Sequence, residues 1–305
     1  MRNTYLKELY AIAKEDKNVL SLVSDNGMIV YDEFRRELPE QYFNFGISEG
    51  HMVTAAAGMA SCGKIPFAYT IGSFLAYRAY EFIRLDVCLQ KLNVKIVGIG
   101  AGVTYGYLGP THHSTEDIAV LRCIPNLTLL SPATPKETKR LVHFAYELNG
   151  PVYIRLGNNL PKELYQPEQE VVPGKITRLR EGDDLAVFAT GEIVYQVMEA
   201  AQLLHQQGIE AAVFSVHTLK PLDEMELLKL AKPYRLLCSV EEHSIIGGLG
   251  GLIAEALTAN GCCKRLIRIG LRDCFAHGYG TPSQVLTANQ LDAAGIYAQI
   301  LAEYK

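Results

Sequence analysis

The sequence has no excess of basic residues, and this limits the partners that it can bind. Its 305 residues include 29 Lys and Arg against 33 Asp and Glu, a formal net charge of -4 at pH 7. It also contains no long basic run. Because nucleic acids and anionic membranes are bound by basic side chains that neutralise phosphates, we expect neither kind of partner.

Membrane-length apolar runs, a signal peptide and paired cysteines are missing too. No apolar stretch reaches the roughly 20 residues that cross a bilayer. The N-terminal stretch MRNTYLKELYAIAKEDKN is charged throughout, unlike a secretory signal. The seven cysteines are odd in number and scattered, and the adjacent Cys262 and Cys263 have no second pair at metal-ligand spacing. We therefore expect a cytoplasmic protein with reduced thiols and no zinc site.

What the sequence does contain is an alternation of apolar, β-branched runs with longer helical patterns. Strands of this kind with helices between them indicate a parallel sheet covered on both faces. Two such units occur, so the sequence predicts an α/β fold of two domains, each a mostly parallel sheet flanked by helices. The predicted boundaries are 1–157 for the first domain, 158–180 for a linker rich in proline and charge, and 181–305 for the second domain.

The individual elements follow from the same patterns. The predicted strands span 19–24, 65–72, 94–100, 127–133, 151–157, 184–191, 211–216, 236–242 and 265–271. The predicted helices span 3–15, 49–62, 74–91, 114–122, 134–148, 194–208, 222–231, 246–260 and 291–304. Because ligands of open α/β sheets collect beyond the carboxyl ends of the strands, candidate site residues lie at the ends of the first-domain strands. These are Ser24–Asp25, Gly46–Glu49, Gly72–Phe74, the segment 100–113 and Arg155.

Each candidate has a structural and a functional interpretation. Glu49 in GISEGHMV either occupies a first helical turn, where the helix dipole favours it, or handles a proton in an apolar pocket. Phe74, Tyr77 and Tyr80 follow one helical stripe, which forms either core or a wall for a flat ring. Arg155 ends an apolar strand, where it either binds an anion or makes a structural ion pair.

Two adjacent histidines stand in the loop YGYLGPTHHSTED. Neighbouring side chains cannot face the same way on a helix, so we expect at most one of His112 and His113 to point into a site. A histidine near a dry cleft is suited to proton transfer at neutral pH. The alternative is an exposed loop with no chemical role.

The order of these stretches is more specific than any one of them. GISEGHMVTAAAGMASCGKIP is followed by GSFLAYRAY, LDVCLQKLNVKIVG, GPTHHSTEDIAVLRCIPNLTLLSPA and VYIRLGN. Together they resemble the pyrimidine-binding domain of transketolases, much of which deoxyxylulose-phosphate synthases share. The second half, with DLAVFATGEIVYQVMEAAQLLHQQGIEAAVFSVHTLKPLD and SVEEHSIIGGLGG, resembles the transketolase C-terminal domain. The resemblance covers nearly the whole chain.

That family uses thiamine diphosphate, and the resemblance implies cofactor contacts in the first domain. Glu49 matches the glutamate that hydrogen-bonds the pyrimidine N1′ and helps the 4′-imino group to deprotonate the thiazolium C2. Phe74 matches the aromatic side chain that stacks on the pyrimidine, and Tyr77 and Tyr80 match further aromatics of the same wall. Asp25 lies where transketolases have an aspartate near the cofactor.

The resemblance also implies substrate contacts. His112 matches the histidine that contacts substrate oxygens and assists proton transfer, and His113 beside it is a further candidate. Arg155 and Arg2 match arginines that grip a sugar phosphate. The implied reaction is transfer of a two-carbon ketol unit from a ketose donor to an aldose acceptor, with small-molecule sugars as substrates.

One part of the family pattern is absent. Complete enzymes of this family bind the diphosphate and a divalent metal through a GDG motif and a downstream asparagine, and this chain has no GDG. Its nearest string, EGDDLAVF, leads into a predicted strand of the second domain, and we find no metal-ligand cluster. We therefore interpret the chain as the C-terminal subunit of a split transketolase. The expected partner is an N-terminal transketolase-type subunit that carries the GDG motif. The Mg²⁺ or Ca²⁺ ion would be bound mainly by that subunit, and the two kinds of chain would form an α2β2 heterotetramer.

The sequence also departs from the family in the loop before the two histidines. Transketolases commonly carry a histidine and an aspartate where Gly100 and Leu108 stand, and the synthases carry an arginine around Ala101. One hypothesis is that Tyr105 and Tyr107 instead shape a pocket for another, less charged ketose.

Other functions stay open at this point. The β subunit of a 2-oxo acid dehydrogenase E1 has the same glutamate-bearing domain and also pairs with a separate subunit, although GPTHHSTEDIAVLRCIPNL is closer to the transketolase pattern. A deoxyxylulose-phosphate synthase-like acyl transferase is a second alternative. A non-catalytic regulatory or scaffolding subunit would keep the fold, but the joint presence of Glu49, Phe74 and His112 argues against it.

Overall fold

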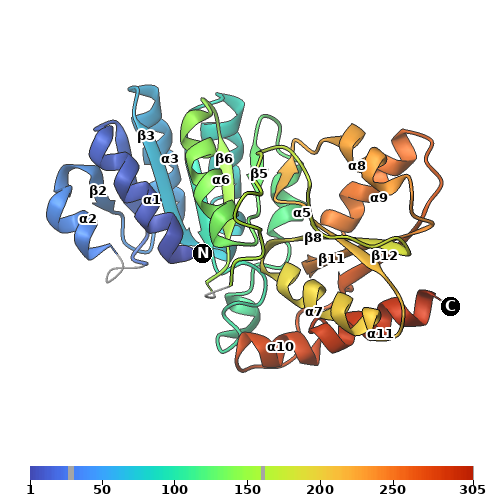
Figure 1. Cartoon of the computed structure of the whole chain (residues 1–305). Coiled ribbons are helices and arrows are strands. Elements are labelled where there is room, and N and C mark those ends of the chain that lie inside the picture. The colour runs from blue at the N-terminus through green and yellow to red at the C-terminus, as the bar shows by residue number, and fades with distance from the viewer. Residues whose placement is uncertain (27–30, 159–161, 305) are drawn as a thin grey trace.

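The computed structural model describes residues 1–26, 31–158 and 162–304, which form a seven-stranded and a five-stranded sheet flanked by helices (Figure 1). In sheet order, the first consists of β10 (Thr218–Lys220), β5 (Thr128–Leu130), β6 (Val152–Leu156), β4 (Lys95–Ile99), β3 (Ile65–Ile71), β1 (Val19–Val23) and β2 (Tyr42–Asn44). The second consists of β12 (Arg265–Leu271), β11 (Leu236–Ser244), β8 (Leu185–Thr190), β9 (Ala211–Ser215) and β7 (Thr177–Arg180). The outer strands β10 and β7 are antiparallel to their neighbours, whereas the other pairs are parallel. The predicted fold class is confirmed.

Helices cover both faces of the first sheet. Helices α1 (Arg2–Glu15) and α6 (Pro135–Glu147) pack on one face, and α3 (Glu49–Ser61), η3 (Ile83–Leu89) and α5 (Asp117–Arg122) pack on the other. Strands β1, β4 and β6 are buried along their whole length, as expected for strands between two helical layers. The start of α6 is fixed locally, because Thr134 accepts a hydrogen bond from the Glu137 N–H and a proline follows it.

The second sheet is built in the same way. Helices α7 (Val194–His205) and α11 (Ala293–Tyr304) pack on one face, and α8 (Glu224–Ala231) and α9 (Leu249–Ala259) pack on the other (Figure 1). The short helix α10 (Pro282–Ala288) begins with a capping box in which Thr281 and Gln284 bond each other's backbone N–H groups. No helix within the described residues has the length and apolar character needed to cross a bilayer.

Several short elements differ from the predictions. The last four residues of the predicted linker form β7, which pairs with β9 and so belongs to the second sheet. Strands β2 and β10 and helices α2 (Asp32–Glu37) and α10 were not predicted. They contain three to seven residues each, too few to show a hydrophobic period. Strand β10 comes from the second half of the chain but completes the edge of the first sheet beside β5.

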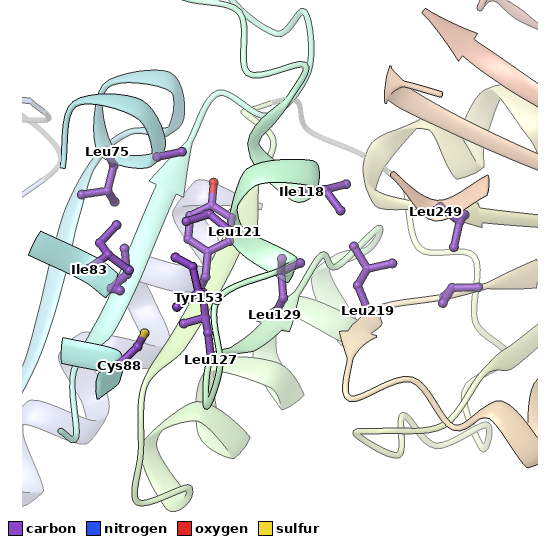
Figure 2. Packing of buried hydrophobic residues seen from close by; sticks show 14 of the residues in the cluster. Leu75, Ile83, Cys88, Ile118, Leu121, Leu127, Leu129, Tyr153, Leu219 and Leu249 are labelled. Atoms are coloured by element: carbon purple, nitrogen blue, oxygen red, sulfur yellow. The ribbon is translucent and has the colours of Figure 1, made fainter. Parts of the chain in front are cut away.

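One hydrophobic core continues through both domains. Figure 2 shows Leu75 and Ile83 at one end, Leu121 and Leu129 between, and Leu249 of the second domain at the other end. A large apolar contact of this kind holds two domains in a fixed relative orientation. Side chains from the second domain are therefore held in place against the loops of the first.

Candidate active site

The carboxyl ends of β2, β1, β3 and β4 meet at one edge of the first sheet, because these neighbouring strands are parallel. The loops after β1 and β2 are tied together there. The Ser24 hydroxyl donates to the Gly46 carbonyl at 2.6 Å and accepts from the Ser48 N–H at 3.0 Å. Helix α3 starts directly after this junction, with Glu49 as its first residue. The edge predicted to carry the site is thus formed as expected from strand order.

Glu49 is buried at this edge, with 4% of its surface exposed. Its Oε2 atom lies 3.5 Å from Nη1 of Arg78, whose own side chain is about half exposed. A carboxylate that served only the helix dipole could stay in water, whereas this one is enclosed beside a cation. The position therefore fits a carboxylate that faces an internal site.

Arg78 also covers Phe74. Both residues belong to η2 (Phe74–Arg78), a π-helical turn that is followed by α4 (Tyr80–Phe82) and η3 in place of the single predicted helix. The Arg78 guanidinium carbon lies 4.0 Å from the centre of the Phe74 ring, a cation–π contact. Such wide helical turns often occur at functional sites. The turn brings an aromatic face and a cation to the Glu49 carboxylate.

His112 also lies beside Phe74. Their ring centres are 4.9 Å apart at an angle of 61°, and the Tyr105 ring lies 6.3 Å from His112. Thr111 Oγ1 is 2.9 Å from His112 Nδ1 and fixes the orientation of the imidazole. Burial, and secondarily the charge of Arg78, lower the pKa of His112 below its usual 6.5. The ring is therefore neutral at pH 7 and able to accept a proton.

Glu49, Arg78, Phe74 and His112 thus form one continuous group, here called the Glu49–His112 cluster. Sequence reasoning predicted three of its members and missed Arg78. The sequence did contain a pattern that could have indicated Arg78, because it stands four residues after Phe74, the spacing at which side chains on a helix meet. The buried hydroxyls of Ser73 and Ser114, near this edge, have no hydrogen-bond partner within the described residues. Unpartnered buried polar atoms of this kind are typical of a place that receives a polar ligand or water.

The two predicted tyrosines take a different direction from Phe74. The Tyr77 hydroxyl donates to Glu116 Oε2 at 2.8 Å and accepts from the Glu116 N–H at 3.0 Å. The Tyr80 hydroxyl lies 3.5 Å from Cys123 Sγ. Glu116 and Cys123 flank α5, so these tyrosines attach the helical segment to α5. Their contact with a cofactor stays a prediction.

Arg155 makes a buried ion pair, which favours the structural interpretation, while its contact with a sugar anion stays a prediction. It is 2% exposed, and its Nε donates to both carboxylate oxygens of Asp117 at 2.9 and 3.1 Å. Its Nη2 donates to the carbonyls of Ser114 and Glu242. Tyr153 donates a further hydrogen bond to Asp117 at 2.9 Å. The guanidinium is thus occupied by a buried ion pair between β6 and α5.

The remaining candidates lie around the same edge. Asp25 has a positive φ of 46° after β1, and its backbone N–H donates to Asn44 Oδ1 at 3.1 Å. Arg2 is the first residue of α1, and its buried Nε has no hydrogen-bond partner in the described part of the chain. Burial raises the pKa of Tyr105, and the positive charge of Arg2 acts in the opposite direction, so the two side chains lie near each other. His113 is 3% exposed, and burial lowers its pKa. Of the two predicted cations, Arg2 has an unpartnered Nε within the described residues, whereas Arg155 pairs with Asp117, and a role for either in sugar binding stays a prediction.

A metal centre is not evident in the part of the chain that the structure describes. No group of three or more His, Cys, Asp or Glu residues there lies close enough together to hold an ion. The Glu49–His112 cluster offers one carboxylate, one imidazole, one guanidinium and an aromatic ring. This set suits an organic ring that carries hydrogen-bonding nitrogens.

Two family models match the chain. One described as "Transketolase, pyrimidine binding domain" matches residues 1–165, and one described as "Transketolase, C-terminal domain" matches residues 174–296. The two models correspond to the two sheets except for β10, which lies in the second match but pairs with β5 of the first sheet.

Similar proteins match almost end to end. The "Putative transketolase C-terminal section" of Methanocaldococcus jannaschii is 39% identical over 308 residues, which cover 100% of this chain and 96% of that protein. One of the subunits of the apulose-4-phosphate transketolase of Phocaeicola vulgatus is 34% identical over 297 residues, covering 97% and 94%. A solved structure described as "Split gene transketolase, inactive beta4 tetramer" is 36% identical with a TM-score of 0.90, and covers 99% of this chain and 97% of its own.

Proposed function

Because the chain belongs to the transketolase family, we propose that it is the pyrimidine-binding subunit of a split transketolase. Together with a separate subunit, it transfers a two-carbon ketol unit from a ketose to an aldose. The observation that carries the proposal is the buried Glu49 carboxylate, which lies at the same sheet edge as the Phe74 ring and His112. The similarity to proteins named as separate transketolase sections or subunits supports the division into two chains.

The residues of the Glu49–His112 cluster fit a pyrimidine ring. Arg78 covers one face of the Phe74 ring, and we assign the stacking to the face that it leaves, while Glu49 offers a carboxylate to a ring nitrogen. Arg78 contacts both and orients the carboxylate. When bound, thiamine diphosphate supplies the carbanion chemistry, while the protein supplies orientation and electrostatics. The role that we assign to Glu49 is to hold and exchange a proton at the pyrimidine.

The diphosphate and its divalent metal are assigned to the partner subunit. This part of the proposal is supported by the missing GDG motif. The relative described as an "inactive beta4 tetramer" of a split-gene transketolase also supports it. A heterotetramer of two chains of each kind is the assembly that we propose.

His112 is proposed to contact the sugar and accept a proton from it. Two observations support this role: its lowered pKa leaves the ring neutral at pH 7, and its ring centre lies 4.9 Å from that of Phe74. Arg2, near Tyr105, is the cation that we assign to an anionic sugar group. A phosphorylated sugar is therefore compatible with the site, even though Arg155 is occupied elsewhere.

The variant His112→Gln is expected to lower kcat/KM for the sugar by about 10², a typical contribution of a general base. In the wild type, activity falls as pH drops through the lowered pKa of His112, because the imidazole becomes charged. This acid limb should be absent in His112→Gln. The pH profile of the assembled enzyme measures it. His205→Gln, an exposed histidine of α7, is the control and should keep the wild-type profile.

A reconstitution assay tests the function itself. The chain is purified, mixed with a chain of the same source that carries GDG, and supplied with thiamine diphosphate, Mg²⁺, a phosphorylated or unphosphorylated ketose and an aldose. Ketol transfer is expected from the mixture and from neither subunit alone. Transfer of an acyl group to lipoamide in place of ketol transfer would contradict the proposal and favour a 2-oxo acid dehydrogenase.

A further inference from the structure

The end of β11 forms a bridge between the two domains. The Ser244 N–H donates to the carbonyl of Thr115 at 2.7 Å, and the Glu242 carbonyl accepts from Arg155 Nη2 at 3.1 Å. His243 Nε2 accepts from the N–H of Ala119 at 3.3 Å. These partners lie in α5, in the segment before it and in β6. The second domain thus contacts the elements that flank the Glu49–His112 cluster.

Within this bridge, the side chain of Glu242 extends from the second domain to a loop of the first domain. It is buried, and its Oε1 atom accepts the N–H of Val103 at 2.6 Å. Val103 lies in the loop between β4 and α5. At the neighbouring Gly102, an added Cβ would lie 2.3 to 2.4 Å from the Glu242 carboxyl group, and its φ is 60°. The backbone at Gly102 and Val103 is therefore in direct contact with the Glu242 carboxyl group.

The loop that contacts Glu242 spans residues 102–114 and contains the side chains proposed to face the sugar. Gly102 and Ser114 close it with two backbone hydrogen bonds, at 3.0 and 2.8 Å. Tyr105 and His112 lie between these closing residues. The Val103 bond to Glu242 therefore fixes the base from which both side chains extend.

We propose that Glu242 is a positioning residue, through which the C-terminal domain sets the place of loop 102–114 and hence of His112. The inference rests on the proposed function for its catalytic consequence, but not for its structural one. The Glu242 carboxyl group is bonded to the base of the loop rather than to the Glu49–His112 cluster, so it acts through the loop. Substrate use should depend on it, and cofactor binding by Glu49 and Phe74 should not.

Charged groups from three neighbouring elements act on Glu242. Burial is the main cause that raises the pKa of Glu242 to about 7. The positive charge of Arg155 on β6 lowers this pKa, whereas the negative charges of Glu192 in η5 (Gly191–Ile193) and Asp117 on α5 raise it. Glu241 and His243 flank it on β11. Because burial raises its pKa, the folded state holds the Glu242 proton more tightly than the unfolded chain does. The stability that this carboxyl group contributes therefore falls as pH rises from 4.5 to about 7, and protection of the loop should fall with it.

Hydrogen–deuterium exchange of the full chain tests the structural part without any assay of activity. Glu242→Ala is expected to speed exchange in peptides covering 103–113 by roughly ten- to a hundredfold, the value of a hydrogen bond to a charged group. Glu242→Gln keeps an acceptor oxygen and should retain most of the protection, but lose its decrease between pH 4.5 and about 7. Glu226→Ala is the matched control, because its carboxylate accepts the Ile176 N–H at 2.9 Å far from this loop.

A second variant guards against a general loss of folding. Gly102→Ala introduces a methyl group that collides with the Glu242 carboxyl, at a residue whose φ of 60° is also unfavourable for alanine, and should raise exchange in the same peptides for both reasons. Exchange in the core strands β4 and β6 should stay unchanged in every variant. Unchanged exchange at 103–113 in Glu242→Ala would overturn the proposal.

Kinetics of the reconstituted complex test the catalytic part. Glu242→Ala should lower kcat/KM for the sugar by about tenfold and leave the Kd of thiamine diphosphate within about twofold, whereas Glu242→Gln restores most of the loss. A parallel loss of cofactor affinity in Glu242→Ala would contradict a positioning role. If the wild-type complex shows no ketol transfer, the proposed function fails, while the exchange data still decide whether Glu242 holds the loop.

Discussion

The variant Glu49→Gln, assembled with the partner subunit, is expected to lose ketol-transfer activity by a factor of about 10² to 10⁴, the range that general acid–base catalysis supplies. Glutamine keeps the shape of the side chain and its packing beside Arg78. It cannot exchange a proton at the pyrimidine. The loss should therefore appear in kcat at saturating sugar and cofactor, and unfolding of the variant should match that of the wild type.

A second glutamate provides the control for this variant. Glu8 is also largely buried, and it pairs with His143 at 2.9 Å and with Lys139 at 3.8 Å on the face covered by α1 and α6. Glu8→Gln should leave kcat nearly unchanged, because it lies away from the Glu49–His112 cluster. If Glu49→Gln kept full activity, the chain would be a scaffolding subunit and the catalytic role of Glu49 would be excluded.

The variant Arg155→Ala should destabilise the protein by about 3–5 kcal/mol, because it leaves the buried Asp117 carboxylate without its cation. Such a loss is a large fraction of the stability of a typical domain. Urea unfolding followed by circular dichroism measures it. Arg84→Ala, which breaks an exposed pair with Glu81, should cause little measurable change.

A double variant separates the structural role of Arg155 from substrate binding. Replacing both partners, as Arg155→Met with Asp117→Leu, should recover part of the lost stability, since it removes the unpaired Asp117 carboxylate but still leaves the carbonyls of Ser114 and Glu242 without the Arg155 donor. If Arg155 instead gripped a sugar anion, Arg155→Ala would raise KM for phosphorylated sugars without a large loss of stability. That result would contradict the assignment made from the Asp117 ion pair.

The fate of the candidate residues shows which features the sequence could predict. Glu49, Phe74 and His112 were placed correctly at one edge, because long apolar strands and their order determine where strand ends meet. Arg155 also follows from a strand, but its partner Asp117 lies 38 residues away on a short helix. Only the packing of α5 against β6 brings the two together, and no local pattern reports such packing.

The bridge between the domains was equally hidden. Glu242 stands in VEEHSIIGG, a stretch in which the glycines are the most distinctive local pattern. Its contact partner Val103 is 139 residues away in the sequence. Strand β10 joins the first sheet from the second half of the chain with only three residues. Long-range contacts made by short segments carry too little local signal to be predicted, whereas domain class and strand order follow from periodicity along the chain.

Cofactor titration tests the central claim most directly: that this chain holds one half of a thiamine diphosphate site. Calorimetry would follow thiamine diphosphate with Mg²⁺ added to this chain, to the GDG-bearing chain, and to their equimolar mixture. The account predicts tight, stoichiometric binding in the mixture only, at one cofactor per pair of chains, and loss of that binding when Phe74 is replaced by alanine. Equally tight binding by this chain alone, accompanied by ketol transfer, would contradict it.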